Sequence, residues 1–231
     1  MIKKDVQAYA ISNWESHLGS ISELSKNNQG ISLVESSIKL YNFDSVCKSI
    51  FEPNTMPTST DALNFSRGTI ELIEFKSGFK QRITKYNFNP KKGKCPHKGQ
   101  VCVDYWDLFF KNQELKISQL ISSIRFKAIE SYITLEKMVF PLCQDVVTPI
   151  PLKLVVVIDE DGIDSIEATY AELAGNTDTE NAVAKHNPLS AIRSALRRLN
   201  NLHDANNNDY LYDCIEVLSV QDYLNKLNQM V

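Results

Sequence analysis

The most informative part of this sequence for the fold is residues 60–78, TDALNFSRGTIELIEFKSG. It contains two runs of residues that favour strands, 60–65 and 69–76, separated by Ser66-Arg67-Gly68. A short turn with glycine between two such runs is typical of a β-hairpin. The sequence therefore predicts an antiparallel pair of strands that turns at residues 66–68.

Alternation along the second strand divides its side chains between two faces. One face carries Ile70, Leu72, Glu74 and Lys76, and the other carries Glu71, Ile73 and Phe75. Ionisable groups at the end of an apolar face are costly to bury unless they pair or bind an ion. Because the hairpin places the start of its first strand beside the end of its second, we expect Asp61, Glu74 and Lys76 to meet at one edge of the sheet.

Two carboxylates and a lysine form a set suited to cutting a phosphodiester. Carboxylate oxygens such as those of Asp61 and Glu74 are ligands that Mg²⁺ prefers. The metal neutralises charge on the phosphate and activates a water molecule. Lys76 would position that water or stabilise the developing negative charge. The alternative is an unrelated α/β protein in which Glu74 and Lys76 form a solvent-facing ion pair, which would contribute little to stability.

The spacing of these residues also resembles a known family pattern. The pattern resembles that of the PD-(D/E)XK nuclease superfamily. It consists here of Asp61, twelve intervening residues and Glu74-Phe75-Lys76, although Thr60 stands where the family pattern has proline. The string IELIEFKSG, residues 70–78, is similar to a strand ending IEFKNG in bacterial and phage proteins of unknown role. In such proteins a long helix and another strand follow. The corresponding helix here contains Arg125, Lys127, Glu130 and Ser131.

This resemblance covers roughly residues 30–160 and implies a restriction-endonuclease-like fold. It implies a hydrolase that acts on DNA, with Asp61 and Glu74 holding Mg²⁺ or Mn²⁺ and Lys76 assisting the chemistry. An upstream helix adds a further acid in some such families, and Glu35 is the best placed candidate. The resemblance equally admits an inactive relative that serves as a binding or interaction subunit in a phage, mobile-element or defence system.

The rest of the sequence predicts one α/β domain with a mixed central sheet flanked by helices. Apolar spacing predicts helices over 4–26, 31–41, 103–138, from Pro188 to about residue 199, and 221–230, with 43–51 either helix or strand. Strands are expected over 79–88 and 214–220 and, buried on both faces, over 152–159. We expect a single domain, 1–231, with a nuclease-like core at about 30–160 and a C-terminal α/β extension, 161–231.

A local basic stretch contrasts with the net charge of −3. Residues 76–103 contain eight lysines and arginines and no acid. Such a stretch can contact DNA phosphates, and the alternative is a solvated lysine-rich loop. The candidate contacts are Lys80, Arg82, Lys85, Lys91, Lys92 and Lys94.

The five cysteines are odd in number and scattered, which is typical of free thiols in the cytoplasm. Cys95, His97 and Cys102 have spacing that could bind Zn²⁺, with a fourth ligand from Cys143 or His186, and an ordinary loop is the alternative. The longest aliphatic run, 154–158, is far shorter than the ~20 residues of a membrane span. The polar N-terminus lacks the apolar core of a secretory signal, so we expect a cytoplasmic protein that does not enter the membrane.

Overall fold

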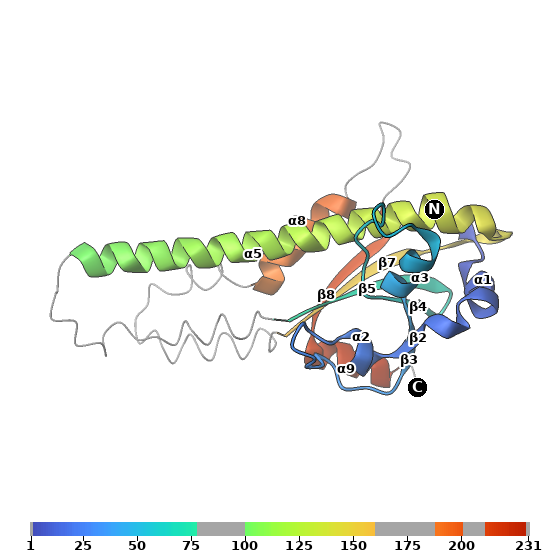
Figure 1. The fold of residues 1–231 in the computed structure, drawn as a ribbon, viewed down its shortest axis with the longest axis horizontal. Coiled ribbons are helices and arrows are strands. Elements are labelled where there is room, and N and C mark those ends of the chain that lie inside the picture. The colour runs from blue at the N-terminus through green and yellow to red at the C-terminus, as the bar shows by residue number, and fades with distance from the viewer. Residues whose placement is uncertain (1, 78–99, 160–187, 201–210, 230–231) are drawn as a thin grey trace.

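The computed structural model describes residues 2–77, 100–159, 188–200 and 211–229 (Figure 1). Several sequence predictions lie outside these described residues. They are the strand over 79–88, the six candidate DNA contacts from Lys80 to Lys94, and Cys95, His97 and His186 of the zinc hypothesis. The side chain of Cys102 also lies outside the description.

A six-stranded mixed sheet forms the centre of the molecule, as expected for the α/β class. Its strands, in spatial order, are β2 (Leu18–Ser20), β3 (Lys39–Asn42), β4 (Ala62–Ser66), β5 (Thr69–Lys76), β7 (Leu152–Ile158) and β8 (Cys214–Ser219). Neighbours from β2 to β5 are antiparallel, whereas β5, β7 and β8 are parallel. β8, which comes from the expected C-terminal extension, therefore belongs to the same sheet as the hairpin. β1 (Ile2–Lys4) and β6 (Asp145–Ile150) pair separately.

The predicted hairpin is present, with a shorter loop than its sequence indicated. β4 and β5 pair from Ala62 opposite Ile73 to Ser66 opposite Thr69, so the loop contains only Arg67 and Gly68. Both loop residues have positive φ, 49° and 73°. Two consecutive positive φ values are characteristic of the type I′ turn, whose twist suits paired strands. Gly68 adopts this conformation without a steric penalty.

Helices cover both faces of this sheet (Figure 1). The core on one face includes side chains from α1 (Val6–Asn13), α3 (Phe43–Ile50), α5 (Gln100–Thr134) and α8 (Pro188–Asn200). The core on the other face includes side chains from α2 (Ile21–Leu24) and α9 (Val220–Asn228). The first half of α5 extends beyond the sheet (Figure 1), and its end continues into a π-helical turn, Leu135–Val139, and a 3-10 turn, Phe140–Leu142. The helices predicted over 103–138, from Pro188 and near the C-terminus are confirmed.

β7 is buried on both faces, as predicted. Leu154, Val156 and Ile158 pack into the core beneath α5, and Val155 and Val157 pack into the opposite core. All five residues are fully buried. A strand with parallel neighbours on both sides and helices on both faces needs apolar side chains throughout, which explains the continuous aliphatic run. Among the described helices, none combines the length and apolar character needed to cross a membrane.

The single helix predicted over 4–26 is wrong. The segment contains α1, a short 3-10 turn (Glu15–His17), β2 and α2. Val6 and Ala10 pack on one side of the sheet and Ile21 on the other, so the chain crosses between the faces. A capping box, in which Ser20 and Glu23 satisfy each other's backbone donors, starts the second helix. The apolar spacing was real, but it belonged to two helices that contribute to different cores.

The helix predicted over 31–41 is also wrong, since only β3 is regular there. The side chain of Ser25 accepts from the backbone of Val34, and that of Ser22 accepts from the backbone of Ser36. The backbone N–H groups of Val34 and Ser36 are therefore bonded to residues of the preceding segment and are not available for helical bonds within 31–41. The ambiguous segment 43–51 is helical, because Asn42 caps α3 by accepting from the backbone of Ser45.

The burial of β7 on both faces leads to a prediction about stability. Replacing the fully buried Leu154 by alanine should lower the free energy of unfolding by about 2–5 kcal/mol, because the surroundings can only partly fill the space. The matched control is Ile11→Ala on α1, where the side chain is 62% exposed and the change should stay within about 0.5 kcal/mol. Urea unfolding followed by circular dichroism measures both values, and equal effects would contradict the assignment of β7 to the core.

Candidate functional site

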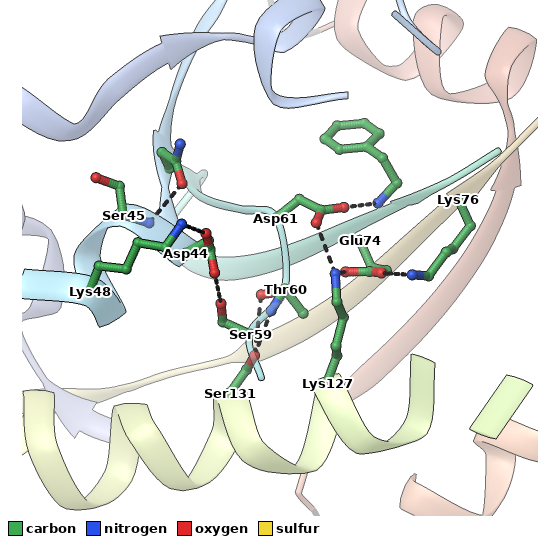
Figure 2. A network of polar contacts seen from close by, with 12 residues as sticks. Asp44, Ser45, Lys48, Ser59, Thr60, Asp61, Glu74, Lys76, Lys127 and Ser131 are labelled. Atoms are coloured by element: carbon green, nitrogen blue, oxygen red, sulfur yellow. Dashed lines mark hydrogen bonds and ion pairs between the residues drawn. The ribbon is translucent and has the colours of Figure 1, made fainter. Parts of the chain in front are cut away.

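Asp61, Glu74 and Lys76 lie together where β4 and β5 begin to separate (Figure 2). Asp61 directly precedes β4, and the other two residues are at the end of β5. Glu74 lies on the face of β5 that packs beneath α5, along with Ile70 and Leu72. The structure therefore brings together the three residues that the sequence singled out, while their catalytic roles stay predictions.

A second lysine, Lys127 of α5, joins the two carboxylates. Its Nζ donates to Oδ1 of Asp61 at 3.0 Å and to Oε2 of Glu74 at 2.9 Å. The ammonium of Lys76 lies 2.9 Å from the other oxygen of Glu74, Oε1. Figure 2 shows the two lysines approaching Glu74 from different sides. The carboxylates of Asp61 and Glu74 thus converge on one cationic group, supplied here by Lys127.

Hydrogen bonds fix Asp61 relative to both the hairpin and α5. Its Oδ2 accepts from the backbone N–H of Phe75 at 2.7 Å, so the side chain continues the strand pairing just before β4 begins. The backbone just before it is tied to α5, because Thr58 donates its N–H and hydroxyl to Glu130 and Thr60 donates its N–H to Ser131. Glu130 and Ser131 follow Lys127 by three and four residues, which places all three on one side of the helix.

Glu74 is the most perturbed ionisable group of the cluster. Its side chain has no exposed surface, so the alternative of a solvent-facing ion pair is wrong. Burial raises the pKa of Glu74 to about 7, the nearby charge of Asp61 adds to the rise, and Lys127 and Lys76 partly offset it. Lys76 is within ion-pair distance of Oε1 but not in hydrogen-bond geometry, so that buried oxygen accepts no hydrogen bond.

Lys127 stays charged in this environment. Burial by itself would lower the pKa of Lys127, but the carboxylates of Glu74 and Asp61 outweigh burial and hold the pKa above its ordinary value. The cluster therefore contains two ammonium groups opposite two carboxyl groups, one of which titrates near neutral pH. Perturbed ionisable groups of this kind concentrate at functional sites.

A cavity of about 430 Å³ opens beside the cluster, a volume typical of ligand pockets. Asp61 and Lys127 line it, together with Asp44 and Glu23. Among the described residues that line the cavity, the acids that precede Asp61 in the sequence are thus Glu23 and Asp44, whereas the predicted Glu35 accepts from Ser22. Glu23 itself accepts from the backbone and hydroxyl of Ser20 in the capping box.

Sequence reasoning gave Lys127 no role in the site. The helix that contains it was expected, but the residue facing the carboxylates depends on the rotation and position of α5 over the sheet. The available signal was the spacing of Lys127, Glu130 and Ser131, three polar residues on one side of an otherwise amphipathic helix. Such a group on the buried side of a helix indicates polar partners on the element beneath.

The donor set of the cluster fits a hard divalent cation. Among the described residues there is no group of three or more His, Cys, Asp or Glu side chains that could hold a metal. Asp61 and Glu74 nevertheless direct one oxygen each at a single cationic group, the ammonium of Lys127. Mg²⁺ is commonly held by one or two carboxylates and completes its coordination with water and substrate phosphate. Two carboxylates are therefore enough if Lys127 moves aside.

The three cysteines whose side chains the structure describes belong to no group that could hold a metal. Cys47 and Cys143 are buried free thiols, and Cys214 is a half-buried free thiol. Cys143, considered as a fourth zinc ligand, donates to the backbone carbonyl of Val139.

In comparisons with known proteins, no family model, no curated protein and no solved structure matches the chain. The chemistry and geometry of the cluster are therefore the basis for assigning a function.

The raised pKa of Glu74 makes a prediction with a definite sign. Infrared or NMR titration of this carboxyl should give a value near 7. Asp61→Asn should lower the pKa because it removes a neighbouring negative charge, and Lys127→Met should raise it because it removes a positive one. A titration near the ordinary carboxyl value in the wild type would contradict the buried geometry.

The same shift has a consequence for stability. The folded state binds this proton more tightly than the unfolded chain, so the contribution of Glu74 is greatest below the ordinary pKa of 4.5 and is lost as the pH rises through about 7. Over that interval, the free energy of unfolding of the wild type relative to Glu74→Gln should fall by up to about 1.4 kcal/mol per pH unit. A difference that rises with pH would contradict the assignment.

Proposed function

We propose that the protein is a metal-dependent deoxyribonuclease of the PD-(D/E)XK type, with a restriction-endonuclease-like core. The observation that carries the proposal is the convergence of Asp61 Oδ1 and Glu74 Oε2 on one cationic group, beside Lys76 at the end of the same strand. The arrangement around it also supports the proposal, since a hairpin presents the acids, α5 covers them, and β7 continues the sheet in parallel with β5.

The charges at the site favour an anionic substrate once a metal binds. With Glu74 ionised, the two carboxylates and the ammonium groups of Lys76 and Lys127 balance one another. A divalent cation held by the carboxylates would give the site two excess positive charges. That charge would offset the two further acids, Glu23 and Asp44, that line the neighbouring cavity, and a bound cation would attract a phosphodiester to the position that it occupies.

Each residue then has a chemical role in the proposal. Asp61 and Glu74 would hold Mg²⁺ or Mn²⁺, which when bound supplies Lewis-acid activation of water and of the phosphate oxygens. Lys76 keeps the buried end of Glu74 in place and directs positive charge at the reacting phosphate. Lys127 would leave the carboxylates and turn into the cavity that it lines, where its ammonium can meet a phosphate oxygen. The lysines and arginine between Lys80 and Lys94 remain the proposed contacts to the DNA backbone.

One observation favours a second candidate function. The ammonium of Lys127 occupies the position that the two carboxylates share. If it never leaves that position, the cluster is a buried ion network that holds α5 on the hairpin. The protein would then be an inactive relative that acts as a binding or interaction subunit.

The nuclease proposal makes a prediction about single substitutions. Asp61→Asn and Glu74→Gln should each abolish Mg²⁺-dependent cleavage of linear, circular or single-stranded DNA and weaken Mn²⁺ binding in calorimetry by at least tenfold, because each removes a charged ligand. The matched control is Glu71→Gln, on the opposite face of the same strand, where the carboxylate is also buried and paired with a lysine. It should retain both cleavage and metal binding. Equal Mn²⁺ affinities for the wild type and Glu74→Gln would sink the proposal.

Lys127 gives a prediction that separates the two functions. Lys127→Met should bind Mn²⁺ roughly 10- to 100-fold more tightly than the wild type, because no ammonium has to be displaced and a charged hydrogen bond contributes about 1.5–3 kcal/mol. Without metal the variant should be less stable by about 3–5 kcal/mol, since it leaves buried carboxylates unpaired, and Mn²⁺ should restore part of that loss.

The matched control for Lys127→Met is Lys226→Met. Lys226 bridges Glu71 and Glu216 on the other face of the sheet, so its removal should reduce stability without any rescue by Mn²⁺. A wild type that neither binds metal nor cleaves DNA, combined with a Lys127→Met variant that binds Mn²⁺, would favour the inactive relative. A Lys127→Met variant that binds metal no better than the wild type would contradict the overlap of the ammonium and metal positions.

A further inference from the structure

A second hollow lies beside the carboxylate cluster, along α5. It has a volume of about 620 Å³ and shares Thr58 and Lys127 with the cavity that Asp61 lines. Its remaining lining comes from one side of α5: Leu115, Ser118, Gln119, Ser122, Ser123, Phe126 and Glu130. We refer to this hollow as the α5 groove. It meets the candidate site at Lys127, the residue that contacts both carboxylates.

The lining of the α5 groove combines an exposed aromatic ring with uncharged polar groups. Phe126 is 63% exposed and is the only aromatic residue among the exposed large apolar residues that the structure describes. It immediately precedes Lys127 in the sequence. Between Phe126 and the exposed Leu115, three turns away, the described residues that line the groove carry only hydroxyl and amide side chains. The one acid, Glu130, is occupied by two hydrogen bonds from Thr58.

We propose that the α5 groove holds an unpaired nucleotide of the DNA substrate, with its base stacked on Phe126 and its phosphate directed at Lys127. This inference rests on the proposed nuclease function and deepens it, because it assigns single-stranded or locally unpaired DNA as the substrate class.

The chemistry of the groove suits a free base and not a duplex. A base offers an apolar face to an aromatic ring and hydrogen-bonding groups at its edge, which match Phe126 and the neighbouring serine and glutamine side chains. In a duplex the faces of the bases are covered by their neighbours, and binding relies on cations that meet the phosphates. Among the described residues that line the groove, Lys127 is the only cation.

A second copy of the chain suits this surface less well. Paired helices need apolar residues every three or four positions along the seam. In the groove the positions between Leu115 and Phe126 are Ser118, Gln119, Ser122 and Ser123, so the seam would be polar over three turns. A base therefore explains the exposed ring of Phe126 beside Lys127 better than a second copy does.

The test measures binding by fluorescence anisotropy, in chelator so that no cleavage occurs, with a labelled oligothymidylate and a labelled duplex of equal length. Phe126→Ala should lower affinity for the single strand roughly 5- to 150-fold, the range that corresponds to about 1–3 kcal/mol per stacked base. Phe126→Trp should retain affinity, and its added indole fluorescence should be quenched by the single strand. The matched control is Ile133→Ala, an exposed apolar residue seven positions further along α5 and outside the groove lining, which should bind like the wild type.

Equal single-strand affinities for Phe126→Ala and the wild type would overturn the inference, as would equal losses for the single strand and the duplex. A third outcome, measured by sedimentation velocity, would also overturn the inference. If the wild type is a dimer and the Phe126→Ala variant is a monomer, a second copy of the chain covers the ring. Because binding is measured without metal, its result is independent of the cleavage assay. Stacking on Phe126 in a protein that lacks cleavage would refute the nuclease and leave a single-strand binding site. DNA cleavage that is the same for Phe126→Ala and the wild type would refute this inference but not the proposed nuclease function.

Discussion

The contact of Lys127 with Asp61 and Glu74 is the interaction on which the arrangement of this molecule depends. It joins the two ends of the hairpin, just before β4 and at the end of β5, to the C-terminal third of α5, more than 50 residues further along the chain. Glu74 has no access to water, so without a nearby positive charge its carboxylate could not stay ionised in the core. The requirement for charge balance therefore fixes how α5 lies on the hairpin. Glu130 and Ser131 strengthen the same attachment one helical turn later.

A comparable lysine bridge lies on the other face of the sheet, where Lys226 of α9 joins Glu71 to Glu216, and Lys153 also bonds to Glu216. The two networks differ in solvent access. Burial favours the protonated form of Glu216 too, but this residue is partly exposed, and its bonds to Lys153 and Lys226 outweigh burial and lower its pKa. At Glu74 full burial prevails and the pKa rises. The network at α9 thus has the properties of a structural support, whereas the network at α5 combines a perturbed acid with an adjacent cavity.

The position of the α5 cluster also explains why one helix can serve both the fold and a site. The buried side of α5 supplies Ile124 and Ala128 to the core, and Lys127 reaches the carboxylates. Phe126 points to a different side of the same turn and remains exposed. One turn of helix thus contributes to the core, to the ion cluster and to the groove beside it. The function that we propose uses this proximity of a charged and an aromatic side chain.

Four features could be predicted from the sequence, because each follows from local alternation, spacing or turn chemistry. They are the hairpin, the two-sided burial of β7, the long helix α5 and the meeting of Asp61 with Glu74 and Lys76. The sequence did not determine the path of residues 4–41, where apolar spacing predicted two helices. The same spacing arises when short elements cross from one face of the sheet to the other, as Ala10 and Ile21 do. Nor did it identify Lys127 as the partner of both acids, or Glu23 and Asp44 as acids that line the cavity. These points depend on how a helix is rotated and placed over a sheet. That placement is set in the folded protein by packing and charge balance between distant segments, so it could not be predicted from local sequence.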